Sequence, residues 1–384
     1  MTLLRSTVYW HVFTLSRSEA ALGWIGLAQF VPTLALTLVG GVAADAYDRR
    51  SVMRLAQLPY LATASLLFWA TWQGTISVPL LYAAVFANAV AFAFDSPARQ
   101  AFLPTLVPLE DFPRAVTFSS TTAALAFATG PALGGLLIAA AGVEAAYAGY
   151  IVLVALNLVG LSFVRSLRRE SERRTPSRQA VREGLAFVRQ SPVVLGCMAL
   201  DMFAVILGGA TALLPVYANE ILAVGPRGYG LLTSSLEIGA LAMSGVLLLR
   251  RPIGRTGPAL LVAVALYGVA TIGFGLSRSF PLSIALYMLA GAADQVSVVM
   301  RQTAVQLSTP DALRGRVSAV NMMFIAASNQ LGAVESGFVA AATSATFAVV
   351  SGGVGCLLVV AFTAWKLPEL RRYRPRPTPG SRSS

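Results

Sequence analysis

The chain has 384 residues, 56% hydrophobic and 12% charged, and a formal net charge of +12. Soluble domains carry about 25% charged residues, so this composition excludes an ordinary soluble globular protein. The single histidine, the two isolated cysteines and the lack of a Gly-x-Ser-x-Gly elbow leave no catalytic or metal-ligating cluster. A phosphate-binding P-loop needs Gly-Lys, whereas the one lysine, Lys366, follows Trp365. We therefore expect no enzyme, no metal, no cofactor and no ATP-driven machine.

Long apolar segments follow one another along the whole chain and predict membrane-spanning helices. Each is close to the roughly 20 residues that a bilayer crossing needs, and none alternates as a barrel strand would. The predicted fold class is therefore an all-α membrane protein, because a helix satisfies its own backbone in lipid. In chain order, we expect about eleven full spans, near 20–44, 53–72, 78–98, 115–141, 145–165, 193–219, 228–249, 258–277, 281–305, 316–341 and 345–365.

The first segment, MTLLRSTVYWHVFTL, is apolar but too short to span a bilayer core of about 30 Å. No small-residue cleavage site follows it, which argues against a secretory signal. We interpret it as a truncated first helix. The expectation is that the natural gene product starts further upstream, or that this is a remnant with eleven helices.

An internal repeat divides the chain into two halves. Shifting the sequence by 202 residues, which carries Arg99 onto Arg301, aligns polar, glycine and proline positions without a gap. This is typical of transporters built from two parallel six-helix halves, with the substrate path between them. The predicted divisions are an N-terminal half at 1–165, a linker at 166–192, a C-terminal half at 193–366 and a basic tail at 367–384. The matched pairs are Arg49 and Arg251, Arg99 and Arg301, Gln100 and Gln302, Pro108 and Pro310, Arg114 and Arg316, Gly130 and Gly332, and Gly135 and Gly337.

Basic residues gather in alternate loops. If the loop at Arg49 and Arg50 is cytoplasmic, the loops on that side hold nearly all the arginines, and the other side holds Arg17, Arg227 and Arg278. This asymmetry follows the positive-inside rule. It predicts a multi-pass protein of the cell (inner) membrane with a cytoplasmic linker and tail. The charge therefore indicates contact with lipid and not with nucleic acid.

The stretch GGVAADAYDRR, residues 40–50, places charges at a predicted helix end. Asp45 can face the positive N-terminus of a helix that begins near Arg316, and Arg49 or Arg50 can pair with Asp95. Such contacts would join the two halves as an inner gate. The alternative is that these charges only end helices and set topology. The full set of predicted gating residues is Asp45, Arg49, Arg50, Asp95, Arg99, Arg314 and Arg316.

Four carboxylates fall inside apolar segments: Asp201, Glu237, Asp294 and Glu335. An ionised carboxylate in hydrocarbon is costly, so each must be paired, face water or bind a proton. Asp294, Asp201 and, third, Glu335 are the candidates for proton coupling, and Glu237 is assigned to the outer vestibule. A fixed ion pair between Asp294 and Arg301, seven residues apart on one helix face, remains the alternative.

The segment TGPALGG contains four residues that suit close helix packing. Gly130, Gly134 and Gly135 would give the helix a flat face, and Pro131 would permit a kink. Aromatic residues and amides such as Gln29 also lie on predicted helices, but their positions in the sequence do not identify a binding site. Apolar walls with few acids fit an amphiphilic or cationic compound, or a siderophore.

These motifs resemble the major facilitator superfamily. GGVAADAYDRR is similar to its loop between helices 2 and 3, although Ala46 and Asp48 stand where a basic residue and a glycine are usual. FDSPARQAFLPTLVP, TGPALGG and RQTAVQLSTPDALRGRVSAV resemble the branch that contains the enterobactin exporter and macrolide-efflux carriers, which are drug:proton antiporters. The resemblance implies a gating role for Asp45 and Arg49. TGPALGG resembles an element of exporting antiporters, although Ala126 replaces a glycine of that element.

The sequence and the resemblance together predict a carrier that works by alternating access. We expect a monomer that exports a small molecule, such as a drug, a siderophore or another amphiphile, in exchange for protons. A facilitator or importer of the same fold, and a non-transporting membrane receptor or scaffold, remain the alternatives.

Overall fold

The computed structural model describes residues 1–108, 110–164, 178–249, 253–310 and 313–373, with the backbone alone at positions 38, 45 and 178–181. No strand occurs among them. The helices are α1 (Thr2–Ser16), α2 (Glu19–Ala46), α3 (Arg49–Trp72), α4 (Val78–Phe102), α5 (Phe112–Phe163), α6 (Arg178–Gln190), α7 (Pro192–Gly208), α8 (Leu214–Val216), α9 (Gly225–Leu249), α10 (Thr256–Leu276), α11 (Phe280–Ser308), α12 (Arg314–Ala342), α13 (Ala345–Lys366) and α14 (Pro368–Arg371), with short 3₁₀ turns at Leu103–Thr105 and Ala210–Leu213 and a π turn at Tyr217–Ile221.

Several helix boundaries follow directly from the local sequence. The Asp48 carboxylate accepts a hydrogen bond from the Ser51 amide at 2.8 Å and so caps α3, and the Ser51 hydroxyl lowers the pKa of that carboxyl. α5 bends at Ala141 and Gly142, where glycine adopts a φ of 84°. The bend divides α5 close to the expected boundary between 115–141 and 145–165. The non-helical dihedral angles lie there, and Pro131, which permits a kink, keeps helical dihedral angles.

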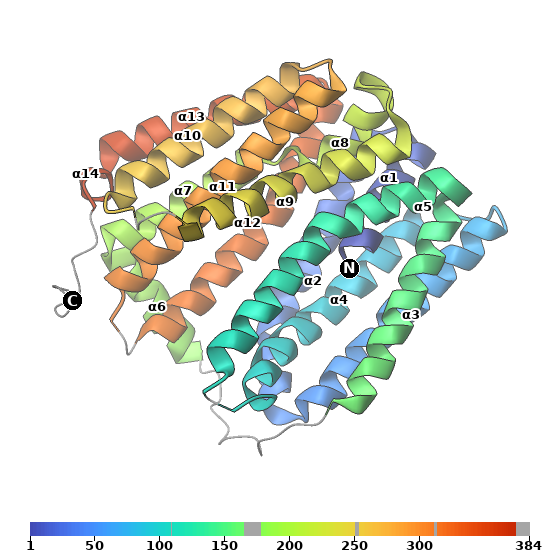
Figure 1. Ribbon diagram of the computed structural model, residues 1–384, viewed down its shortest axis with the longest axis horizontal. Helices are drawn as coiled ribbons and strands as arrows, with labels where there is room; N and C mark the ends of the chain where they lie inside the picture. The colour runs from blue at the N-terminus through green and yellow to red at the C-terminus, as the bar shows by residue number, and fades with distance from the viewer. Residues whose placement is uncertain (109, 165–177, 250–252, 311–312, 374–384) are drawn as a thin grey trace.

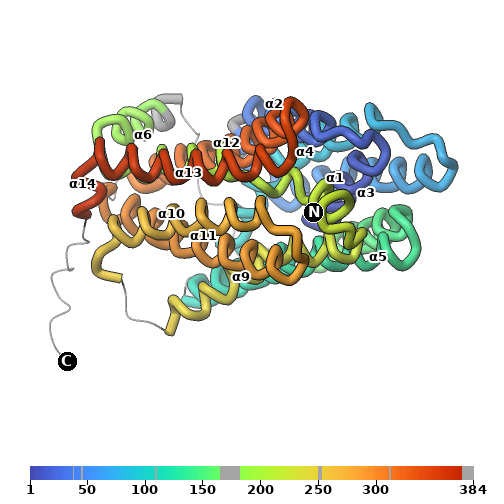
Figure 2. Tube along the Cα trace, turned by 90° about the horizontal axis from the view of Figure 1, so that it is seen from above, coloured from blue at the N-terminus to red at the C-terminus, as the bar shows by residue number. Residues whose placement is uncertain are grey.

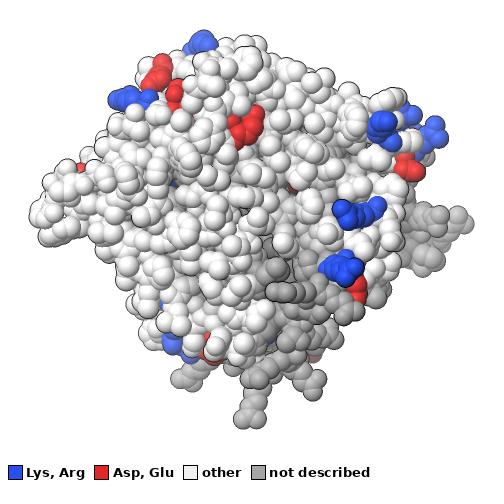
Figure 3. Space-filling view, turned by 180° about the vertical axis from the view of Figure 1, so that it is seen from behind, with Lys and Arg blue, Asp and Glu red and all other residues white. Residues whose placement is uncertain are grey.

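The membrane fold class is confirmed. Among the described residues, nine helices are long and apolar enough to cross a membrane: α2, α4, α5, α7 with the turns after it, and α9 to α13. α5 counts once although Figure 1 shows its two arms running in different directions. Large apolar side chains such as Phe163, at 79% exposure, and Leu249, at 91%, lie on the outer surface. Figure 3 shows a wide uncharged area between charged groups at the top left and along the right side, as a surface facing lipid requires.

The helices form two groups with matching internal packing. Figure 1 shows α1 to α5 on one side and α7 to α13 on the other, and Figure 2 shows the same division from above. In the first group α4 packs against α2 and α3, and in the second α11 packs against α9 and α10 in the same way. The offset of 202 residues carries Phe112, the first residue of α5, onto Arg314, the first of α12. Repeated sequence thus forms repeated structure.

The two groups meet through α2 against α12 and α5 against α9. We call the end of the bundle that carries Asp48, Thr105 and Arg314 the linker side, and the opposite end, with Ser18 and Thr343, the far side. Near the far side, a Cβ atom on Gly26 would lie 2.9 Å from the Gln330 carbonyl oxygen. A Cβ on Gly230 would lie 2.7 Å from the Pro131 carbonyl oxygen. Glycine therefore permits both close approaches, which we call the far-side seams.

The buried core of the described residues joins the two groups toward the far side. One large apolar cluster there draws residues from both groups, and the Tyr229 hydroxyl of α9 donates to the Ser6 carbonyl of α1 at 3.0 Å. Toward the linker side the described core separates into two clusters. One belongs to α2 to α5 and the other to the C-terminal group with α6. The two groups therefore diverge toward the linker side.

Candidate functional site: a central cavity open toward the linker side

Two adjoining cavities occupy the space between the diverging groups. One, of about 480 Å³, is lined by α2, α4 and α12 and extends toward the linker side at Gln100 and Ala319. The other, of about 240 Å³, lies deeper, between α1 to α5 and α12. They share Thr33, Phe92 and Gln330, so they form one continuous space. We call this space the central cavity, and its combined size suits a small organic molecule.

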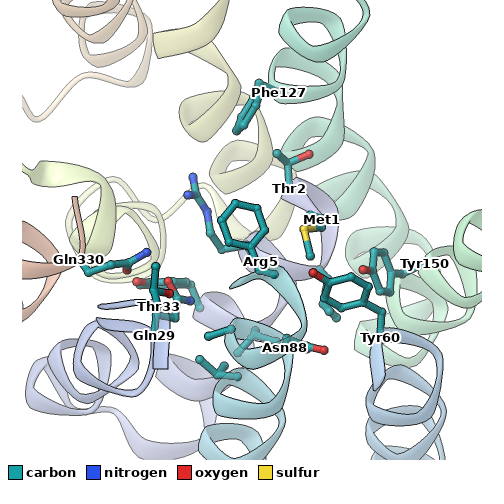
Figure 4. Close-up of a pocket in the computed structure, with 16 residues that line it drawn as sticks. Met1, Thr2, Arg5, Gln29, Thr33, Tyr60, Asn88, Phe127, Tyr150 and Gln330 are labelled. Carbon is teal, nitrogen blue, oxygen red and sulfur yellow. The ribbon is translucent and has the colours of Figure 1, made fainter. Parts of the chain in front are cut away.

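The deeper part of the central cavity has apolar walls with a few polar groups (Figure 4). Arg5 on α1 is the only charged side chain among the described lining residues of both cavities. The polar lining also includes Gln29, Thr33 and Asn88 from the first group and Gln330 from the second. Aromatic side chains complete the wall: Tyr9, Tyr60, Phe92, Phe127 and Tyr150.

Two lining residues have informative hydrogen bonding. The Thr63 hydroxyl lies 2.8 Å from the Asn88 side-chain oxygen and 2.7 Å from the Pro59 carbonyl oxygen, so its single proton is shared between these two acceptors. The Tyr60 hydroxyl is buried and has no hydrogen-bond partner among the described residues. Buried polar groups in native proteins are nearly always partnered, so an unpartnered hydroxyl beside a cavity is a candidate ligand contact.

Several predicted gating residues contact their own half. Asp95 is 4% exposed, forms an ion pair with Arg99 at 3.1 Å and accepts a hydrogen bond from Gln57 at 3.3 Å. Arg49 donates to the Ala101 carbonyl at 3.0 Å, and Arg50 donates to the Leu161 carbonyl at 2.8 Å. The expected pairing of Arg49 or Arg50 with Asp95 is therefore wrong in this conformation. Backbone carbonyls at the ends of α4 and α5 are nearer to the two guanidiniums.

The gating residues Arg314 and Arg316 of the second half have described contacts within the C-terminal group. Arg316 forms an ion pair with Glu183 of α6, and Arg314 donates to the Gln306 carbonyl at 3.4 Å. Both contacts stay within the C-terminal group, as expected where the linker side is open. The side chain of Asp45 lies outside the described part of the structure, so its partner is untested. Residue 165 of the N-terminal half, residues 166–177 of the predicted linker and residues 374–384 of the tail also lie outside it.

Arg301 does not pair with Asp294, the partner that the sequence analysis gave as an alternative to proton coupling. Arg301 of α11 forms a buried ion pair with Asp201 of α7, not with Asp294. Asp294 instead lines a small cavity of about 20 Å³ with Asp201, Tyr267 and Ser297. The reason is that α7 packs against α11 and presents Asp201 to the guanidinium. Two of the three coupling candidates thus lie in one cluster, which we call the acidic cluster.

The remaining intramembrane carboxylates are separate from that cluster. Glu335, the third coupling candidate, is on α12 and accepts a bond from the neighbouring Ser336 hydroxyl at 3.3 Å. Glu237 on α9 is partly buried and lies within electrostatic range of both Arg5 and Asp294.

The glycines of TGPALGG pack on two different helices. Gly130 lies against Thr2, and Gly134 lies 3.2 Å, measured from an ideal Cβ, from the Ser6 hydroxyl, so both face α1. Gly135 faces Gly230 on α9, and the Pro131 carbonyl contributes to the same seam. One short motif therefore serves packing within a half and closure between halves.

Sequence reasoning missed Arg5 as a lining residue. Its helix was judged only by length, as too short to span, and the arginine within it was left unassigned. The available signal was a lone arginine in an otherwise apolar segment, because charges in such segments usually face a cavity.

The family profile and the curated relatives that match this chain both describe membrane export proteins. The profile described as "Transmembrane secretion effector" matches residues 3–377. The enterobactin exporters EntS of Escherichia coli O1:K1 and of O139:H28 are each 25% identical over 360 residues, covering 88% of this chain and 82% of the exporter.

Solved structures share the fold at lower identity. A bacterial homolog of the human lysosomal transporter Spinster, inward-facing and occupied, has a TM-score of 0.72 at 14% identity, covering 98% of this chain and 97% of that one. A D-xylose-proton symporter has a TM-score of 0.71 at 16% identity, covering 97% and 98%. The relatives and the fold are those of transporters and not of enzymes. The chain belongs to the transmembrane secretion effector family of the major facilitator superfamily, whose members are multi-pass membrane transporters of small molecules.

Proposed function

We propose that this protein exports a small molecule across the cell (inner) membrane by alternating access, in exchange for protons. The observation that carries the proposal is the central cavity, which is closed at the far side by the two seams and extends toward the linker side. The excess of arginines in the linker-side loops supports a cytoplasmic linker side. Substrate would then enter from the cytoplasm, and the enterobactin exporters among the relatives support the outward direction.

Export requires the two halves to exchange which side is closed. In the proposed second conformation the far-side seams separate and the linker-side ends of α2 and α12 approach each other. Asp45, Arg49, Arg50, Asp95 and Arg99 would then face Arg314 and Arg316 across the closed gate. The domain divisions predicted from the sequence, 1–165 and 193–366, correspond to the two bodies that would move.

The acidic cluster supports proton coupling. With both carboxylates ionised, Asp201, Asp294 and Arg301 would carry one net negative charge inside the bundle, which low-polarity surroundings disfavour. A proton on Asp294 would neutralise the cluster without breaking the Asp201–Arg301 pair. Asp294 is therefore the first coupling candidate, while Asp201 holds Arg301, and Glu335 on α12 is a separate acceptor.

Transport into inverted membrane vesicles tests the proposal. The full chain would be supplied with a panel of dyes, antibiotics and siderophores, with and without an imposed pH gradient. The expected result is uptake that falls to the level of empty vesicles when the gradient is collapsed. Uptake that ignores the gradient would favour a facilitator or importer, and no uptake of any compound would favour a receptor or scaffold.

A further inference from the structure

Three polar groups at the deep end of the central cavity can donate hydrogen bonds, and the amides and hydroxyl of Gln29, Thr33 and Gln330 in the same wall can donate or accept. Arg5 contributes a guanidinium, Asn88 a side-chain amide NH₂ and Tyr60 an unpartnered hydroxyl. They come from α1, α4 and α3 and all line the deeper part of the central cavity, where Figure 4 shows the Arg5 guanidinium pointing away from Tyr60 and Asn88. Three donors from three helices need acceptors, and the described protein supplies none for Tyr60.

The charge of Arg5 is also without a fixed partner. Among the described residues, no carboxylate lies within ion-pair distance of it. Glu237, from the opposite half, is within electrostatic range but forms no ion pair with it in the described structure. Asp95 is held by Arg99 and Gln57. A guanidinium at membrane depth that is paired with nothing is expected to face water or a ligand.

We propose that the transported molecule is an aromatic or amphiphilic anion whose acidic group binds Arg5, with Tyr60 and Asn88 as further donors. Guanidinium binds carboxylates, sulfonates and similar oxyanions strongly because it offers several donors in one plane. The aromatic wall formed by Tyr9, Phe92, Phe127 and Tyr150 would hold the apolar part of the molecule. This inference rests on the proposed transport function, and it revises the expectation of a cationic substrate.

A matched pair of fluorescent probes tests the inference by binding alone. Anilinonaphthalene sulfonate is an aromatic anion, and phenylnaphthylamine is the same molecule without the sulfonate. Affinities would be measured on the purified full chain in lipid nanodiscs, with empty nanodiscs subtracted. The wild-type chain is expected to bind the anion at least about tenfold more tightly than the neutral probe. Equal affinity for the two probes would overturn the inference without any mutation.

The variants Arg5→Gln and Arg5→Lys then locate the site. Arg5→Gln is expected to bind the sulfonate about ten- to a hundredfold more weakly, since charged hydrogen bonds contribute about 1.5–3 kcal/mol, and to keep its affinity for the neutral probe. Arg5→Lys should retain most of the preference because it keeps the charge. Arg227→Gln, on the exposed far-side start of α9, is the matched control and should behave as wild type. Full sulfonate affinity in Arg5→Gln would overturn the assignment.

The binding assay separates this inference from the proposed function. If the wild-type chain prefers the anion and Arg5→Gln does not, the anion site is established even if vesicles show no export. If vesicles export compounds but the probe preference is absent or independent of Arg5, the export proposal stands and the anion site is wrong.

Discussion

At the residue scale, single side chains in similar surroundings differ in whether they have a partner. Tyr60 on α3 and Tyr217 in the π turn after α8 are both buried tyrosines. The Tyr217 hydroxyl donates to the Gly275 carbonyl at 3.0 Å, whereas the Tyr60 hydroxyl has no partner among the described residues. The same side chain therefore stabilises the fold at one position and remains available to a ligand at the other.

This difference predicts unequal effects of removing the two hydroxyls. Tyr217→Phe is expected to lower the free energy of unfolding by about 1 kcal/mol, because a hydrogen bond is lost. Tyr60→Phe should leave it unchanged or slightly higher, because no bond is lost. Thermal unfolding of both variants in the same detergent checks this. A larger loss for Tyr60→Phe than for Tyr217→Phe would mean that Tyr60 has a structural partner.

Asp294 carries the prediction about coupling. Asp294→Asn cannot release a proton, so transport by this variant should no longer respond to an imposed pH gradient, while binding of the transported compound persists. Inverted vesicles measure this directly. Glu220→Gln, an exposed carboxylate at the far side, is the control and should keep its gradient response. An Asp294→Asn carrier still driven by the gradient would remove Asp294 from the coupling mechanism.

Asp45 carries the prediction about gating. Asp45→Asn is expected to lower the initial transport rate about tenfold, a cost of about 1.4 kcal/mol in the closing step, with normal membrane insertion. The loss would arise because the neutral amide binds the start of α12 less strongly. Asp48→Asn is the control three residues away, because asparagine can still cap α3. Normal transport by Asp45→Asn would show that its charge only marks a helix end.

At the scale of the helix, small residues decide how closely two halves can approach. Gly337 of α12 faces the backbone of Gly23 in α2, with no room for a Cβ atom between them. The corresponding seam between α5 and α9 uses Gly135 and Gly230. At these two contacts backbone meets backbone, which lets the helices approach closely.

Filling the seam should shift the conformational equilibrium. Gly337→Leu is expected to open the far side and raise the thiol reactivity of a cysteine placed at Ala333, which packs near Gly26. A change of about 1 kcal/mol in the equilibrium gives about a fivefold increase. Gly245→Leu, where no atom lies within 4 Å of the added Cβ, is the control. Unchanged reactivity in Gly337→Leu would mean that the far-side closure does not depend on this contact.

At the scale of the whole molecule, the cores suggest two bodies that share one end. The apolar cluster common to both groups lies toward the far side, and separate clusters stabilise each group toward the linker side. Each body can therefore keep its own packing while the angle between them changes. Rocking of two repeats around a central site is the expected movement for such an arrangement.

Distances between spin labels can follow this movement. One pair at Phe118 and Leu248, exposed near the linker side, should become shorter when the transported compound or a pH gradient drives the cycle. A second pair at Arg17 and Thr343, at the far side, should become longer under the same conditions. A pair within one half, at Trp72 and Phe163, should not change. Parallel changes in the first two pairs would contradict alternating access.

The sequence by itself determined the features that depend on local pattern. Apolar segments of membrane length predicted the helices, and the offset that carries Arg99 onto Arg301 predicted the repeat. These predictions succeed because hydropathy and repeated spacing can be read within one segment or by comparing two segments. The resemblance in GGVAADAYDRR likewise identified the superfamily, which the family comparison confirmed.

Only the tertiary structure decided which charges meet and what faces the cavity. Arg301 pairs with Asp201 on another helix, Arg49 binds a backbone carbonyl instead of Asp95, and Arg5 lines the central cavity. Each outcome depends on the rotation of one helix against others that are distant in sequence. The closed far side depends further on a balance of a few kcal/mol between two arrangements of the same halves. A local sequence pattern determines neither the rotation of one helix against another nor this free-energy balance. Both arise from contacts that form only when the whole bundle is assembled.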